Sequence, residues 1–106
     1  MVEKNATLID RVHLQKYIYL LNLFCSQEIE PVDFEKTFLQ IRREDNYWMS
    51  GSFNESIDRV LNSFFLDLDE YNPDNLFDKN DVFNINEKEL RKRANDTLQK
   101  LLILSN

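Results

Sequence analysis

The residues best suited to chemistry are acidic, and they gather in one stretch of the chain. Asp67 and Asp69 are two residues apart, a spacing at which carboxylates can hold a metal ion or share a proton. With Tyr71 they also occupy alternating positions of a calcium-binding loop whose twelfth residue would be Asp78. That loop requires a glycine where Asn72 stands, an oxygen ligand in place of Tyr71 and usually a glutamate at its last position. We therefore predict no metal site and no cofactor.

The other nucleophilic and metal-binding side chains are isolated from one another. His13 is the sole histidine and Cys25 the sole cysteine, and no cysteine stands at a metal-binding spacing from the histidine. Neither a glycine-rich phosphate loop nor a nucleophile elbow is present. We therefore predict that the protein is not an enzyme, that His13 lies at the surface or the core boundary, and that Cys25 is a small core residue.

Negative charge is concentrated in the middle of the chain. Residues 55–81 hold eight acidic and two basic residues, and this balance equals the net charge of -6 of the whole chain. Such a charge repels nucleic-acid phosphates and anionic lipid and attracts a cationic protein surface. The predicted partner-binding residues are Asp67, Asp69, Glu70, Tyr71, Asp74, Phe77, Asp78 and Asp81. The alternatives are an acidic loop that is merely solvated, or a role for Asp69 and Tyr71 in fixing the end of a helix.

Helices must position these residues, because one glycine and two prolines are too few turn formers for a β-sandwich or barrel. Apolar residues recur at helical spacing in residues 6–25, 31–44, 57–68 and 90–102. Pro31 suits the first position of the second helix. Ser52 and Glu55 are spaced as a capping box for the third helix, and Asn86 with Glu89 gives a similar start for the last, which should run nearly to residue 105.

The first predicted helix is apolar on two sides. One stripe consists of Leu14, Tyr17, Ile18, Leu21 and Cys25. The second stripe consists of Leu8, Val12, Tyr19 and Leu23. Since a helix that is apolar on two sides is usually surrounded by others, we predict a central position for this one.

Length and composition suffice for one core, because 42% of the 106 residues are apolar. No repeat or interdomain linker interrupts residues 1–106, and the first three helices are joined by short connections. The predicted fold is all-α: a single-domain antiparallel four-helix bundle with a long acidic connection, residues 69–85, between the third and fourth helices. A structureless connection longer than about 12 to 15 residues is unusual in a compact domain, so we expect function there.

Two further features bear on surroundings and surfaces. Residues 1–10 carry Glu3 and Asp10 and lack an apolar signal segment, and no run approaches the roughly 18 apolar residues of a membrane span. With a single cysteine, the chain is expected in the cytoplasm, neither exported nor anchored. Trp48, in the second connection, either closes the end of the bundle or is an exposed interface anchor.

Four segments follow one another in an informative order: YIYLLNLF, SQEIEPVDFEKTFLQI, FFLDLDEY and INEKELRKRANDTLQKLL. They cover the chain from about Leu14 to Leu102, and together the chain resembles the family of the colicin D immunity protein. This family includes immunity proteins of contact-dependent growth inhibition systems. The resemblance implies a helical bundle that binds the C-terminal nuclease domain of a toxin and blocks its substrate site. In the family's type case the toxin cleaves tRNA.

The charge pattern and the resemblance lead to the same expectation. An acidic surface that imitates phosphate charge can cover the basic cleft of a tRNA-targeting nuclease domain. We therefore expect an immunity protein that binds its toxin one to one and binds neither nucleic acid nor membrane itself. The alternative is a helical adaptor or regulatory subunit that binds another protein and has no connection with toxins.

Overall fold

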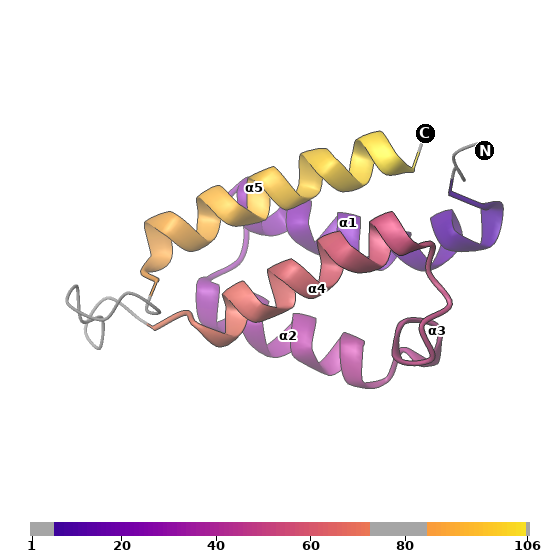
Figure 1. The fold of residues 1–106 in the computed structure, drawn as a ribbon. Coiled ribbons are helices and arrows are strands. Elements are labelled where there is room, and N and C mark those ends of the chain that lie inside the picture. The colour runs from indigo at the N-terminus through magenta and orange to yellow at the C-terminus, as the bar shows by residue number, and fades with distance from the viewer. Residues whose placement is uncertain (1–5, 73–84, 106) are drawn as a thin grey trace.

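The computed structural model describes residues 6–72 and 85–105, and this part of the chain is helical (Figure 1). It contains α1 (Leu8–Cys25), α2 (Pro31–Arg43), α3 (Asn46–Met49), α4 (Glu55–Asp69) and α5 (Glu87–Leu104). The described residues form no strand, so the predicted all-α class is confirmed. In the ribbon view α5 lies along α4, and α5 also packs against α1. None of the described helices combines the length and the apolar character needed to cross a membrane.

Side-chain caps fix where the helices begin. Thr7 starts α1 in a capping box with Asp10, each side chain accepting a 3.0 Å hydrogen bond from the other residue's backbone N–H. Pro31 occupies the first turn of α2, and Asn86 caps α5 by accepting from the N–H of Glu89 at 2.9 Å, as predicted. These local signals act within one turn, which is why the sequence alone reveals them.

The predicted capping box of the third long helix, Ser52 with Glu55, is wrong. Asn54 caps α4 instead, and its Oδ1 accepts from the N–H of Ile57 at 2.9 Å. The hydroxyl of Ser52 lies 2.8 Å from that of Ser50. Because an asparagine caps a helix as well as a serine does, the choice between them depends on where the preceding turn places each side chain.

The connection between α2 and α4 contains a helical turn that was not predicted from the sequence. Asp45 caps this turn, α3, and its Oδ1 accepts from the N–H groups of Tyr47 and Trp48 at 3.0 and 3.3 Å. Gly51 follows with φ +73°, a backbone conformation that favours glycine. Trp48 is buried, so it closes one end of the core and is not an exposed anchor.

Aromatic side chains form the centre of the core. Phe24 stacks on Phe34 with ring centroids 4.1 Å apart, and Phe64 meets Phe38 edge to face at 5.4 Å. Tyr17 contacts Trp48 in the same manner. These rings come from α1, α2, α3 and α4, and such pairs stabilise by roughly 0.5–1.5 kcal/mol beyond the burial of their area.

The predicted central position of α1 is wrong. Its first stripe is inside, with Leu14, Tyr17 and Leu21 fully buried. Leu8, Val12 and Tyr19 of the second stripe are 68%, 61% and 66% exposed, and Leu23 is only partly buried. Among the described elements, α2 and α5 are the ones that pack closely on α1. An apolar pattern shows which face favours burial, but it does not specify that the covering surface belongs to the same chain.

Candidate functional site at the acidic end

The two ends of the acidic connection are held together. Tyr71 and Ile85 form an isolated bridge, in which the N–H of Asn72 donates to the carbonyl of Ile85 at 3.0 Å. The N–H of Ile85 in turn donates to the carbonyl of Glu70 at 3.1 Å. Ile85 is buried, and Tyr71 packs partly against the core. The prediction that residues 69–85 are structureless is therefore wrong at both ends of the segment, because these residues bury apolar area.

Asp67 points away from the predicted surface toward α5. Its Oδ1 lies 2.7 Å from Nη1 of Arg93, whose Nε lies 3.0 Å from Oε2 of Glu89. The hydrogen bonds to Glu89 and Asp67 raise the pKa of Arg93, against the opposing effect of its burial. Asp67 is thus paired within the fold, where it ties α4 to α5.

Asp69 is exposed at the last position of α4, and Glu35 of α2 lies close to it. Partial burial raises the pKa of Glu35, and the negative charge of Asp69 raises it further. Glu35 was not among the residues predicted from the sequence, because it lies on another helix. The available signal was its position on α2 beside the inward-facing Phe34 and Phe38.

Glu70 caps the C-terminus of α4 with its backbone N–H, and its side chain is partly exposed. The carbonyl groups at a helix C-terminus carry partial negative charge, so Asp69 and Glu70 stand where carboxylates are unfavourable. The last turn of α4 contains no basic residue. Negative potential therefore accumulates at this point instead of being neutralised locally.

The structure brings together part of the predicted site. Asp69, Glu70 and Tyr71 lie at the junction of α4 and the bridge to Ile85, and Glu35 joins them from α2. We call Glu35, Asp69, Glu70 and Tyr71 the acidic end. Asp67 is not part of the acidic end, because its carboxylate forms an ion pair with Arg93. The remaining predicted residues, Asp74, Phe77, Asp78 and Asp81, lie outside the residues that the structure describes.

A second polar cluster joins α1 to α3 and has a structural role. Asp45 is buried and accepts a 2.6 Å hydrogen bond from Tyr17 Oη, while Lys16 Nζ lies 3.1 Å away. Burial raises the pKa of Asp45, but these hydrogen bonds outweigh it and the pKa is lowered overall. Asp10 accepts a 2.6 Å hydrogen bond from Tyr47 Oη. Burial raises the pKa of Asp10 too, but its hydrogen bonds outweigh that effect and the pKa is lowered overall. Every polar group of this cluster is used within the fold.

The isolated candidates occupy ordinary structural positions. His13 is partly exposed and stacks on Tyr47 with ring centroids 4.0 Å apart, which confirms a boundary position. Cys25 is partly buried against the core, and burial raises the pKa of its thiol despite the opposing charge of Arg91. Within residues 6–72 and 85–105, no three His, Cys, Asp or Glu side chains form a group that could hold a metal ion.

The basic run at the start of α5 is paired with acids. Arg91 bonds Glu87 at 2.9 Å and donates to the carbonyl of Phe24 at 2.5 Å, and Lys92 lies 3.4 Å from Asp96. Arg91 thereby joins α5 to α1, and Arg93, bound to Asp67, joins α5 to α4, whereas the pair of Lys92 with Asp96 lies within α5. Among the described residues, the cations of this run are thus paired with acids of the chain, whereas Glu35, Asp69 and Glu70 form no ion pair.

Comparison with protein-family models gives one finding that agrees with this geometry. Residues 12–101 match the model described as bacterial self-protective colicin-like immunity. The match spans most of the chain and includes both Glu35 and Asp69. A search of curated proteins and a search of solved structures found no match. On the extent of the family match, the chain belongs to the bacterial colicin-like immunity family.

Proposed function

We propose that this protein neutralises a bacterial toxin by placing the acidic end over a basic surface of that toxin. Membership of the immunity family supports the toxin as the partner. Two observations support the surface: Asp69 is exposed at the C-terminus of α4, and its negative charge acts on the partly buried Glu35 of α2. Within the described residues, Glu35, Asp69 and Glu70 form no ion pair. A cation from the partner would relieve the repulsion between these carboxylates and bind strongly for that reason.

The toxin surface that fits best is a phosphate-binding cleft. We propose a C-terminal nuclease domain that cleaves tRNA, bound one to one, in a bacteriocin or contact-dependent growth inhibition system. Such a cleft is lined with lysine and arginine to hold an RNA backbone, and closely spaced carboxylates imitate that backbone's charge. The protein acts by occupying the cleft and performs no chemistry itself, which is consistent with its paired and buried polar groups.

The scaffold of this function is one domain comprising residues 1–106, and we propose that its four long helices form an antiparallel bundle. The order of contacts supports this arrangement, because Glu35 lies near Asp69 whereas Arg42 packs on Phe65. Residues therefore pair in opposite order along α2 and α4. A free thiol at Cys25 is compatible with action in the cytoplasm, where a nuclease would meet its RNA.

The decisive experiment is growth of cells that express the toxin domain encoded immediately upstream, with and without this chain, followed by co-purification. Rescue with a stable complex is the expected result. The surface is tested with the triple variant Glu35→Gln, Asp69→Asn and Glu70→Gln. Its association with the toxin should slow at least about tenfold at low salt, and the salt dependence of association should shrink.

A matched variant separates the surface from the net charge. Glu44→Gln, Glu55→Gln and Asp96→Asn together change the charge equally, at exposed positions away from the acidic end. This control should associate nearly as fast as the wild type. Equal slowing in both variants would refute the acidic end as the docking surface. A well-folded chain that gives neither rescue nor complex would favour the adaptor function instead.

A further inference from the structure

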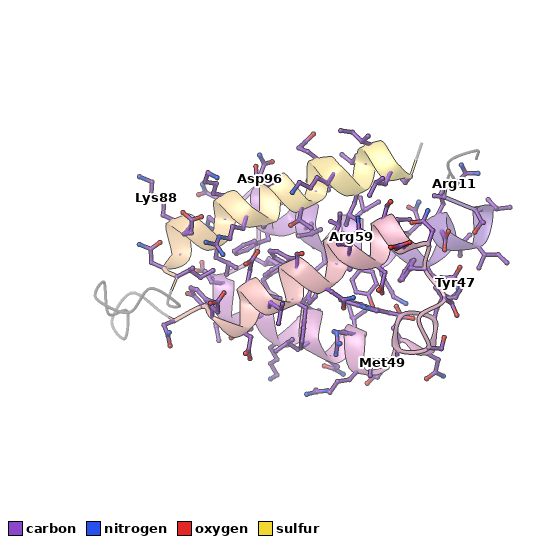
Figure 2. The ribbon with its side chains drawn as sticks, in the orientation of Figure 1. Arg11, Tyr47, Met49, Arg59, Lys88 and Asp96 are labelled. Carbon is purple, nitrogen blue, oxygen red and sulfur yellow. The ribbon has the colours of Figure 1, made fainter. Side chains whose placement is uncertain are left out.

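A polar pocket lies beside α3, on the side of the molecule formed by α2 and α4. Its volume is about 260 Å³ and its lining is Arg42, Trp48, Met49, Gly51, Asp58 and Asn62. Met49, the last residue of α3, lies at the edge of the molecule in Figure 2, and its side chain is exposed. Neither the family match nor the acidic end accounts for this pocket.

Arg42 is held in the pocket by aromatic rings. Its guanidinium carbon lies 3.9 Å from the ring centroid of Phe65 and 4.8 Å from that of Trp48. Its buried Nε has no hydrogen-bond partner among the described residues. Ring faces attract the cation but leave its N–H donors unsatisfied, and an unmade hydrogen bond at a buried donor is costly. Arg59, Arg91 and Arg93, in contrast, each bind a carboxylate of this chain.

The polar groups of Trp48, Asn62 and Asp58, on the other side of the pocket, are hydrogen-bonded to one another. Trp48 Nε1 donates to Asn62 Oδ1 at 3.2 Å, and Asn62 Nδ2 donates to Asp58 Oδ2 at 3.0 Å. This chain of hydrogen bonds fixes the amide of Asn62 and uses one of its two N–H groups. Arg42 is the charged donor in the lining of the pocket, and the group that suits a guanidinium best is a carboxylate.

The pocket and the acidic end share one surface. Glu35 and Arg42 are seven residues apart on α2, and Asn62 and Asp69 are seven apart on α4. Seven residues are two helical turns, or about 10 Å, so each pair lies on one face of its helix. Between them α4 presents Leu66, which is 59% exposed. A surface with an apolar centre and opposite charges at its two ends has the composition of a protein interface.

We propose that the Arg42 pocket receives an aspartate or glutamate side chain of the toxin, while Leu66 packs beneath the contact and the acidic end binds the toxin's cations. This proposal rests on the proposed function, since it requires a bound toxin. The carboxylate accepts hydrogen bonds from Arg42, and Met49 packs against its methylene groups. A toxin that lacks an acid at this position leaves Arg42 unsatisfied under the interface, so the pocket selects between related toxins.

The test compares Arg42→Gln with Arg43→Gln, its exposed neighbour on α2. Arg42→Gln should weaken toxin binding at least about tenfold, chiefly through faster dissociation, whereas Arg43→Gln should change it less than about twofold. Each surface Asp or Glu of the toxin domain is then neutralised in turn. One of these changes should weaken binding to the wild-type chain and have almost no further effect on Arg42→Gln. Absence of any such coupled carboxylate overturns the proposal.

Asp58→Asn identifies the ligand without altering Arg42. Removal of the negative charge from the wall should tighten binding of a carboxylate, and weaker binding would mean that an N–H donor occupies the pocket, contrary to the proposal. Thermal unfolding of each variant verifies that it is folded. If the wild-type chain binds no toxin, the proposed function fails as well. If it binds and Arg42→Gln binds equally well, only the pocket proposal fails.

Discussion

At the scale of single residues, carboxylates of this chain have opposite environments. Asp45 and Asp10 are buried and surrounded by donors, and the pKa of each is lowered despite its burial. Glu35 is half-buried beside Asp69, and its pKa is raised by burial and by that charge. The charged forms of Asp45 and Asp10 stabilise the fold. The charged form of Glu35 lowers the free energy of unfolding, but it contributes negative charge to the acidic end.

Substitution of Glu35 by glutamine should therefore make the chain more stable and less active. At pH 7 the free energy of unfolding of the variant should rise by on the order of 0.5 kcal/mol, because the substitution removes a partly buried charge and its repulsion with the exposed Asp69. Since the pKa of Glu35 is raised in the folded state, its cost is absent below the ordinary carboxyl pKa and grows as pH rises through the folded value. Chemical denaturation should show the gain in the free energy of unfolding at pH 7 but not at pH 4. A separate binding measurement should show weaker toxin binding by the variant. A loss of stability at pH 7 would contradict this account.

Asp45→Asn should have the opposite effect on stability. The amide still accepts hydrogen bonds, but it loses the charge that binds Lys16 and strengthens the bond from Tyr17, at a cost of about 2 kcal/mol. The pKa of Asp45 is lowered, so its contribution is present above the ordinary carboxyl pKa and is lost as pH falls through the folded value. Urea unfolding from pH 7 downward should show the two proteins converging in acid. Glu44→Gln, at the exposed position before it, should remain within about 0.5 kcal/mol of the wild type.

At the scale of elements, short-range rules located the helices but not every boundary. Asn86 and Pro31 act on the turn that immediately follows them, and their roles were predictable. Two residues able to cap α4, Ser52 and Asn54, stand two positions apart and could not be ranked from spacing alone. The α3 turn was missed because its four residues are too few for a periodic pattern to emerge.

The cap of α4 can be assigned by two alanine variants. Asn54→Ala should destabilise the chain by about 1 kcal/mol, because the N–H of Ile57 loses its acceptor. Ser52→Ala should cost less than about 0.5 kcal/mol, since its hydroxyl bonds only Ser50 at the surface. Thermal melting of both variants measures the difference. A larger loss of stability in Ser52→Ala than in Asn54→Ala would indicate that Ser52 is the cap.

At the scale of the whole molecule, the described residues leave an apolar face of α1 exposed and an acidic end whose carboxylates form no ion pair among them. Leu8, Val12 and Tyr19 are exposed on that face, although their spacing matches that of a buried stripe. The folded chain is elongated, with extents of 46 × 27 × 24 Å, and its described helices contact one another around a core that excludes this stripe. Surfaces that remain to be covered are typical of a protein that functions by binding another.

Because the stripe is uncovered, polar substitutions on it should be tolerated. Val12→Gln and Tyr19→Gln should each change the free energy of unfolding by less than about 0.5 kcal/mol. Leu14→Ala, on the buried stripe of the same helix, should cost about 2–5 kcal/mol. Chemical denaturation of the three variants checks the contrast. A large loss at Val12 or Tyr19 would indicate that this face is packed after all.

The sequence by itself determined the helical class, the four long helices and the inner faces of α2, α4 and α5, because periodicity and caps act over a few residues. It also located the excess of acid and, through four ordered segments, the immunity family that the comparison confirmed. Only the tertiary structure decided which acidic residues are paired within the fold and which remain at the proposed docking surface. Asp67 is bound to Arg93, and Glu35 joins Asp69 across two helices. It likewise placed Arg42 between Phe65 and Trp48. Charge and ring contacts depend on distances between residues far apart in the chain, and those distances exist only once the helices have packed.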